Sequence, residues 1–320
     1  MSEIVRPTRD GIHGREFIST AVDLGPKPPF LRFDERGELR QQVSPTLSLP
    51  IPVLFDLPPA TVLSQRLGKI LLATAEEAET LLILPVAAIK KFALFGRPIV
   101  PLITARDGLA GADFQFEPRL IELDGWDDGL YRQAQGQFPG SIICLRLDSV
   151  SKEELLRTFA AGMRVFHLAT NYHGRDRDGR FVLDLIREAH QVFVNAGFRD
   201  EVTLLGSGGI VAAEHVPKAI ICGLDVVGLD TPLLVALQAQ FLGECADRQT
   251  SQFKLPAALK TDWAKQRVTN LLASWRDQLL EVLGAMGLRE VRRLRGEMGR
   301  AMFQIDLERE AFSGIEGYGS

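Results

Sequence analysis

A repeated alternation of short apolar runs with helical patterns is the feature that most constrains the fold of this chain. Eight apolar runs recur between residues 51 and 227, and a helical pattern or a loop follows each. Several runs are apolar throughout, which is typical of strands that are buried on both faces of a parallel sheet. Eight such units predict a (β/α)8 TIM barrel. The predicted strands are residues 51–55, 80–84, 99–104, 119–123, 141–147, 164–169, 202–205 and 224–227.

The position of the glycine-rich loops separates the barrel from its alternative, a doubly wound open sheet. No G-x-G-x-x-G pattern follows the first strand, whereas glycine-containing loops follow the last two strands, where barrels hold phosphate. Glycine lets backbone N–H groups approach an anion, and the start of the next helix adds a favourable dipole. The candidate phosphate-binding residues are Gly206, Ser207, Gly208 and Gly209 after the seventh strand, and Gly228, Asp230 and Thr231 after the eighth.

The segments outside the repeat form two appendages. Residues 1–48 are predicted to be an extension with a small hairpin that turns at Gly37, and residues 49–255 form the barrel. Residues 256–320 form a helical segment, in which residues 263–286 have the apolar spacing of a long amphipathic helix. Its apolar face packs either on the barrel or on a protein partner. The arginines that follow, Arg289, Arg292, Arg293, Arg295 and Arg300, suit a solvated face better than an anion-binding patch.

Composition excludes several classes of protein. The formal net charge is −4 and the isoelectric point is about 5.8, which argues against a nucleic-acid-binding protein. No apolar run has the roughly 20 residues that span a bilayer, and the first residues lack the apolar core of a signal peptide. The three cysteines lie far apart and form no C-x-x-C pair, which is typical of reduced thiols. We therefore expect a cytoplasmic protein without a membrane span.

The last third of the chain resembles the FMN-binding synthase domain of the large subunits of glutamate synthase. The pair Gly208-Gly209 stands where this family has a D-G-G-L phosphate loop. Residues 224–237 parallel the family pattern G-A-x-x-x-G-x-G-T-x-x-L-I-A-L, and residues 281–296 parallel E-I-L-A-x-L-G-x-R-S-x-x-E-L-x-G-R. The detailed match covers residues 203–245 and 262–298.

The resemblance implies a TIM barrel that uses FMN and a [3Fe–4S] cluster to reduce an imine to glutamate. It assigns the FMN phosphate to the two glycine-containing loops, and Ser207 would add a hydroxyl donor. Arg146 stands where the family has a lysine on the fifth strand, so the implied role is to stabilise reduced flavin or an anionic substrate. The alternative for Arg146 is a structural ion pair with Asp148 or Glu122.

The sequence departs from the family at the cofactor positions. The family's cluster pattern, C-x5-C-x4-C, falls on Ala239, Cys245 and Thr250, so one thiol of three remains. Because thiolates hold iron–sulfur clusters, we predict no cluster, and we expect Cys245 to be either a leftover of the cluster site or a core thiol. Asp230 replaces a family glycine, and a carboxylate repels a phosphate. The alternative for Asp230 or Thr231 is an N-cap, with Pro232 in the first turn of the helix.

The loops that surround the family's substrate are also different. Residues 121–126 lack the family's lysines and glycines, and residues 171–180 replace a G-G-T-G-A signature. His167, on the sixth strand, is either a core histidine or an acid–base group. The loop that carries His173 and three arginines is either solvated or an anion site.

These observations leave the enzymatic status open. The first hypothesis is a divergent FMN-dependent oxidoreductase that lacks the [3Fe–4S] cluster. The second is a catalytically degenerate barrel that serves as a structural or regulatory subunit of a larger complex and docks through its C-terminal helices. The third is a flavin-free barrel that binds a small phosphorylated ligand.

Overall fold

The computed structural model describes residues 17–27, 33–40, 45–109, 114–297 and 309. Within this part of the chain, eight parallel strands close into a barrel in the order β10-β3-β4-β5-β6-β7-β8-β9. The predicted (β/α)8 TIM barrel is therefore confirmed, and the open-sheet alternative is wrong. The barrel strands are β3 (Val53–Phe55), β4 (Leu82–Pro85), β5 (Ile99–Thr104), β6 (Leu120–Asp124), β7 (Ile142–Leu147), β8 (Val165–Ala169), β9 (Thr203–Ser207) and β10 (Val226–Leu229).

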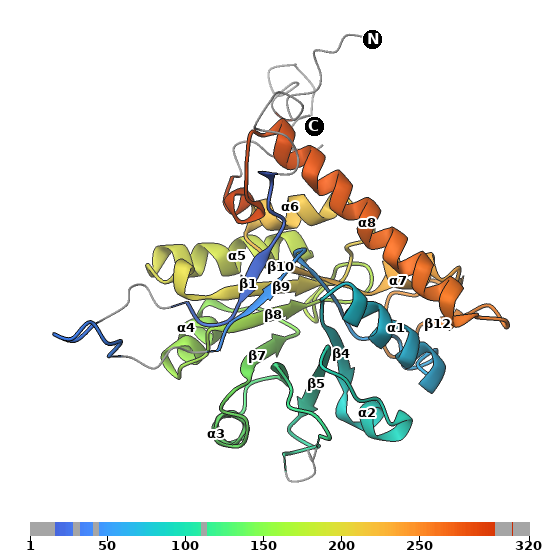
Figure 1. Ribbon diagram of the computed structural model, residues 1–320, viewed down its shortest axis with the longest axis horizontal. Coiled ribbons are helices and arrows are strands. Elements are labelled where there is room, and N and C mark those ends of the chain that lie inside the picture. The colour runs from blue at the N-terminus through green and yellow to red at the C-terminus, as the bar shows by residue number, and fades with distance from the viewer. Residues whose placement is uncertain (1–16, 28–32, 41–44, 110–113, 298–308, 310–320) are drawn as a thin grey trace.

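Helices surround the barrel on the outside (Figure 1). Their starts follow from local sequence: Ser64, Asp127 and Ser151 each accept a hydrogen bond from a backbone N–H in the first turn that follows. Ser151 accepts from the backbone N–H of Glu154, which stands three residues on, as in a capping box. The outer helices are α1 (Gln65–Glu77), α2 (Val86–Phe92), α3 (Asp128–Gln137), α4 (Lys152–Ala160), α5 (Val182–Asn195), α6 (His215–Cys222) and α7 (Thr231–Ala236), with short 3-10 turns η4 (Arg199–Glu201) and η5 (Val291–Leu294).

A two-stranded antiparallel sheet precedes the barrel and covers the amino-terminal ends of its strands. It consists of β1 (Val22–Leu24) and β2 (Leu47–Leu49), whose inward side chains belong to the main core. Thr203, at the start of β9, donates to the carbonyl of Gly25 at 3.1 Å, which ties the sheet to the barrel. The predicted turn at Gly37 is present as a bridge between Phe33 and Leu39, while residues 30–32 of the proposed hairpin lie outside the described residues.

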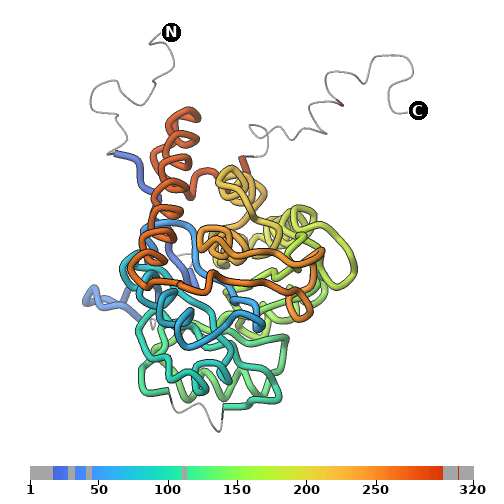
Figure 2. Tube along the Cα trace, turned by 90° about the vertical axis from the view of Figure 1, so that its right-hand side faces the viewer, coloured from blue at the N-terminus to red at the C-terminus, as the bar shows by residue number. Residues whose placement is uncertain are grey.

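The long amphipathic helix packs on the barrel itself. Helix α8 (Thr261–Ala285) lies along the outside of the molecule beside α1 and α7 (Figures 1 and 2). Its buried side chains, which include Val268, Leu272 and Leu283, join the main core. Of the two occupants that the sequence allowed for this apolar face, the barrel takes most of it. No helix in the described part of the chain combines the length and the apolar character that crossing a membrane requires.

Gly228, on β10, lies in the barrel interior where there is no room for a larger side chain. A Cβ atom at Gly228 would lie 2.7 Å from the Cβ of Ser207 and 3.3 Å from that of Asp56. Both neighbours belong to the strand ends that carry the polar groups described below. We expect Gly228→Ala to lower the free energy of unfolding by about 1–3 kcal/mol, because the core is overpacked.

The matched control is Gly136 in the exposed part of α3, where an added Cβ meets no atom within 4 Å. Gly136→Ala is expected to raise stability by about 0.5–1 kcal/mol, since alanine loses less backbone freedom in a helix. Urea unfolding of both variants measures the difference. Equal effects at the two positions would show that the barrel is not close-packed at Gly228.

Candidate functional site

A buried ion-pair network fills the barrel interior at the carboxyl ends of the strands. Its centre is Arg146 on β7, which reaches across the barrel to Asp56, directly after β3. The guanidinium donates two hydrogen bonds to the two carboxylate oxygens of Asp56, at 2.9 and 3.1 Å. It also donates to Glu122 on β6 at 3.2 Å. Arg146 is 5% exposed, and both carboxylates are fully buried.

A hydrogen-bonded chain leads from this centre to the seventh-strand loop. His167 on β8 contacts Glu122 through Nδ1 at 2.5 Å and the hydroxyl of Ser207 through Nε2 at 2.9 Å. The serine, histidine and carboxylate stand in the order that nucleophilic catalysis uses. All three side chains are fully buried, however, so the hydroxyl of Ser207 is not accessible to a substrate in this structure. In this structure the hydrogen bonds between Ser207, His167 and Glu122 orient these buried side chains.

Arg248 covers the network at the carboxyl ends of the strands. It lies between β11 (Gln240–Leu242) and β12 (Gln252–Lys254), a hairpin that follows α7. One guanidinium nitrogen is 3.0 Å from Asp56, and another donates to Asp230 at 2.9 Å. The Nε atom donates to the carbonyl oxygen of Thr170 at 2.8 Å, and the guanidinium lies over the ring of Tyr172. Arg248 therefore bridges the ends of β3, β8 and β10.

The loop that carries Arg248 is itself held in place. The N–H of Tyr172 donates to the carbonyl oxygen of Ala246 at 3.0 Å, and Thr61 donates to that of Ser251 at 3.2 Å. These contacts join the hairpin to the loops after β8 and β3. The position of the Arg248 loop over the polar network thus depends on the loops that follow β3 and β8.

The pKa values of the buried carboxyl groups depend on how many arginines contact each of them. Asp56 contacts two arginines, whereas Asp230 contacts one. Burial alone would raise the pKa of Asp56, but Arg146 and Arg248 together hold it well below its usual value. Burial raises the pKa of Asp230, and Arg248 offsets this effect only in part. Burial would lower the pKa of Arg146, but Asp56 and Glu122 raise it above the ordinary arginine value. Asp56 and Arg146 therefore form a permanently charged pair.

The predicted phosphate loop after β9 is packed against protein. Gly208 and Gly209 have φ angles of 94° and 70°, which favour glycine. A Cβ at Gly208 would lie 2.5 Å from the carbonyl oxygen of Asn171 and 2.7 Å from that of Thr170. At Gly209 it would lie 2.7 Å from the Cα of Gly174. The glycines allow this close approach of two loops, and the Thr170 hydroxyl and two carbonyl oxygens lie against Gly208.

The predicted phosphate residues after β10 act as a helix cap. The carboxylate of Asp230 accepts the N–H of Thr231 at 2.5 Å and the Thr231 hydroxyl at 3.1 Å. Pro232 follows in the first turn of α7. The N-cap alternative for Asp230 is therefore what the structure has, and its carboxylate stands at the helix start where a phosphate would bind. Gly206 and Gly228 lie inside β9 and β10, packed beneath Leu224 and against Ser207.

The other residues that the sequence singled out are placed as follows. Arg146 pairs with Glu122, as one alternative proposed, but Asp148 instead pairs with Arg177 at 3.6 Å. The ring of His173 contacts the carbonyl oxygen of Glu244, so this histidine holds the Arg248 loop. Arg180 is engaged by Asp176 and Glu188, which favours a structural role for that loop.

The region that holds the cluster in the family contains a small apolar cluster here. Ala239 and Cys245 are partly buried against Tyr172, Leu234 and Phe253. The thiol of Cys245 donates to the carbonyl oxygens of Leu242 and Gln252 at 3.5 and 3.3 Å. Cys245 is therefore a partly buried thiol of the hairpin. In the part of the chain that the structure describes, no group of three or more histidine, cysteine or acidic side chains is arranged to hold a metal ion.

Sequence reasoning missed the site residues Asp56 and Arg248. Asp56 carried a usable signal, because a carboxylate directly after an apolar barrel strand occupies the position where barrel sites lie. Asp230 carries the same signal on β10. Arg248 had none, since it lies in an irregular loop and reaches the network through tertiary contacts alone.

Comparisons with known proteins confirm the resemblance over the carboxy-terminal part of the chain. Residues 168–289 match the family model described as a conserved region in glutamate synthase. The archaeal glutamate synthase [NADPH] of Methanocaldococcus jannaschii is 32% identical over 132 residues, which is 39% of this chain and 26% of that protein. The equivalent protein of Archaeoglobus fulgidus is 31% identical over 153 residues, which is 45% of this chain and 30% of that protein. The matched part thus spans about a quarter of the length of these relatives.

Solved structures with a similar fold include variants of flavocytochrome b2 and of mandelate oxidase. A flavocytochrome b2 variant with sulfite bound superposes with a TM-score of 0.55 at 13% identity, covering 95% of this chain and 82% of that one. A mandelate oxidase variant with (S)-mandelic acid gives a TM-score of 0.54 at 15% identity, covering 91% and 95%. At this identity the likeness establishes the barrel fold alone.

Removal of Arg248 tests the network. We expect Arg248→Gln to lower the free energy of unfolding by about 2–4 kcal/mol near neutral pH, because two buried carboxylates lose a cation. The pKa of Asp230 is already raised, and without Arg248 it rises further above its unfolded value. A carboxyl group with a raised pKa loses stability as the pH rises through that pKa, so the variant's deficit should be larger at about pH 7.5 than at about pH 4.5.

Urea unfolding at the two pH values measures this effect. The matched control is Arg132→Gln, which removes an exposed ion pair with Asp128 on α3 and should cost less than about 0.5 kcal/mol at either pH. A deficit for Arg248→Gln that matches the control, or that does not depend on pH, would contradict the network.

Proposed function

Because residues 168–289 carry the conserved region of glutamate synthase, we propose that this chain is a glutamate-synthase-type barrel that is closed to flavin by its own side chains. It acts as a non-catalytic structural or regulatory subunit of a larger assembly. The observation that carries this proposal is the position of Arg248, paired with Asp56 and Asp230 across the carboxyl end of the barrel.

The groups at the phosphate position do not fit the FMN phosphate. The carboxylate of Asp230 already accepts the hydrogen bonds at the start of α7, and it would face the incoming anion. The carbonyl oxygens of Thr170 and Asn171 face Gly208 from the opposite loop. An anion at the start of α7 would meet the carboxylate of Asp230, which Arg248 already pairs, and repulsion between partly buried like charges is on the order of a kcal/mol or more per contact. The proposal therefore assigns no reaction step to FMN.

The same proposal excludes a [3Fe–4S] cluster. Its support is the loss of two of the three thiols, at Ala239 and Thr250, and the engagement of Cys245 with carbonyl oxygens of the hairpin. Thiolate ligands are required to hold such clusters. A cytoplasmic location fits the three cysteines, which are all free thiols in this structure.

A second candidate is the divergent FMN oxidoreductase without a cluster. The family relationship favours it, together with the guanidinium of Arg146, which places a positive charge inside the barrel on the strand where the family has a lysine. This function needs two changes at the site: Arg248 must leave Asp56 and Asp230, and the loop after β8 must move away from Gly208.

Flavin titration distinguishes the two candidates. The unmodified protein should be colourless when purified, and added FMN should keep the fluorescence of free flavin. Arg248→Ala combined with Asp230→Gly removes the bridging cation and the repelling carboxylate, so this variant should bind FMN more tightly than the unmodified protein by about tenfold or more. Stoichiometric FMN that stays with the unmodified protein through gel filtration would sink the closed-barrel proposal and support the oxidoreductase.

The subunit role requires a stable partner. Apolar side chains remain exposed around α7, β11 and the start of α8, with Val235 at 60%, Leu242 at 49% and Trp263 at 37% exposure. We expect affinity-tagged protein from its native cells to co-purify with a defined partner, and Val235→Glu to weaken that association. The control is Val194→Glu on α5, which is similarly exposed on another helix. A protein that is recovered alone and monomeric would contradict the subunit role.

A further inference from the structure

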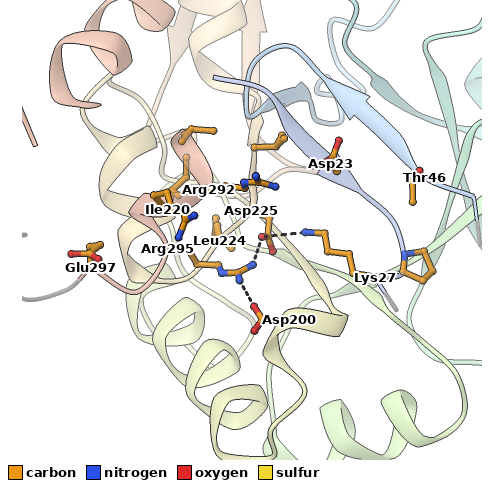
Figure 3. Close-up of a pocket in the computed structure, with 14 residues that line it drawn as sticks. Asp23, Lys27, Thr46, Asp200, Ile220, Leu224, Asp225, Arg292, Arg295 and Glu297 are labelled. Carbon is orange, nitrogen blue, oxygen red and sulfur yellow. Dashed lines mark hydrogen bonds and ion pairs between the residues drawn. The ribbon is translucent and has the colours of Figure 1, made fainter. Parts of the chain in front are cut away.

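The two ends of the barrel are covered in different ways. At the amino-terminal ends of the strands, the inward side chains of β1 and β2 belong to the main apolar core. Charged contacts add to this packing: Figure 3 shows Lys27 and Arg295 converging on the buried carboxylate of Asp225, with Asp200 beyond Arg295. Because its side chains share the main core, this cover should unfold together with the barrel.

The cover at the carboxyl ends of the strands belongs to a separate packing unit. It is the cover hairpin, residues 238–254, which comprises β11, β12 and the loop between them. None of these residues, all of which the structure describes, is part of the main core, whereas the flanking Leu237 and Leu255 are in it or pack against it. Only Ser251 and Phe253 of the cover hairpin are buried, and the ring of Phe253 lies in the small apolar cluster.

Polar contacts join the cover hairpin to the loops after β3 and β8. Its backbone carbonyl groups accept hydrogen bonds from the N–H of Tyr172, the hydroxyl of Thr61 and the ring of His173. Arg248 supplies the remaining contacts described above. Segments with few buried apolar contacts and solvent-exposed hydrogen bonds open at a lower free energy than the core. The cover hairpin has both properties.

The boundary between the cover hairpin and the barrel also contains groups that the closed state does not satisfy. The hydroxyl groups of Tyr172 and Ser251 are buried and have no hydrogen-bond partner. Gln238 and Cys245, which flank β11, have φ angles of 58° and 50°, and residues other than glycine adopt such angles rarely. Opening lets water reach the two hydroxyl groups and lets the backbone at both residues relax, so both features lower the cost of opening.

We propose that the cover hairpin opens while the barrel remains folded, so that it acts as a strap over the carboxyl end of the barrel. Opening withdraws Arg248 from Asp56 and Asp230 and exposes the hydroxyl of Ser207. Access of any small molecule to these groups then depends on the opening equilibrium. This inference takes the closed state of the proposed function as its starting point, but it needs neither a flavin nor a partner.

Hydrogen exchange of the full chain, resolved to single amides by fragmentation mass spectrometry, tests this proposal. Two amides of one loop give the comparison. The N–H of Tyr172 donates to Ala246 of the cover hairpin, whereas the N–H of Thr170 donates to Ser207 of the barrel. After correction for intrinsic rates, Tyr172 should exchange at least about tenfold faster than Thr170, because local opening exposes the first amide alone.

Thr61→Val tests whether the cover hairpin controls the Tyr172 amide. The variant removes the hydrogen bond to the carbonyl oxygen of Ser251, which lies in the cover hairpin. Loss of one such bond should speed exchange at Tyr172 by about two- to tenfold and leave Thr170 unchanged. The control is Thr104→Val, which removes an exposed side-chain hydrogen bond at the end of β5 and should change neither amide.

The proposal is overturned if Tyr172 and Thr170 exchange at the same corrected rate in the unmodified protein. It is also overturned if Thr61→Val speeds both amides equally or speeds neither. Because the exchange measurement contains no flavin, its outcome does not depend on the flavin titration, and failure of this proposal can be told from failure of the proposed function.

Discussion

The structure of the barrel interior depends on the pairing of Arg146 with Asp56. The bidentate contact crosses the barrel from β7 to the end of β3, and Glu122 and Arg248 each contact one member of the pair. A buried ion pair gives little net stability, because desolvation offsets the attraction, but removing one partner costs about 3–5 kcal/mol. Glu122, His167 and Arg248 therefore have to be present and oriented. At the carboxyl end of the barrel, the charged side chains of this network pair with one another.

The family relationship of the chain and the contacts at this end of the barrel therefore have to be considered separately. The glycines at 208 and 209 belong to a loop that the glutamate synthase relationship associates with phosphate, yet here they admit the backbone of residues 170–174. Asp230 likewise keeps the start of α7 capped without a ligand. Arg248, from the loop of the β11–β12 hairpin, contacts both the carbonyl oxygen of Thr170 and the carboxylate of Asp230. In the closed barrel that we propose, these contacts engage polar groups at this end of the barrel without a bound cofactor.

The fold was predictable because it is encoded locally. Continuous apolar runs marked the barrel strands, and the spacing from Trp263 to Met286 marked α8. The site was predictable only in part. Arg146, Ser207 and the partner Glu122 were named from the sequence, but the bidentate partner Asp56 was not, because it lies 90 residues from Arg146. Arg248 acts through tertiary contacts from an irregular loop, which no periodic pattern reveals.

A double-mutant cycle on Arg248 and Asp230 tests the closed barrel most directly. The cycle compares the unfolding free energies of the unmodified protein, Arg248→Gln, Asp230→Asn and the double variant, so that the loss of the helix cap cancels. A close, largely buried pair should show a coupling energy of about 1–3 kcal/mol. A coupling energy within about 0.3 kcal/mol of zero would mean that Arg248 does not bridge the barrel end in solution, and the site would then be open.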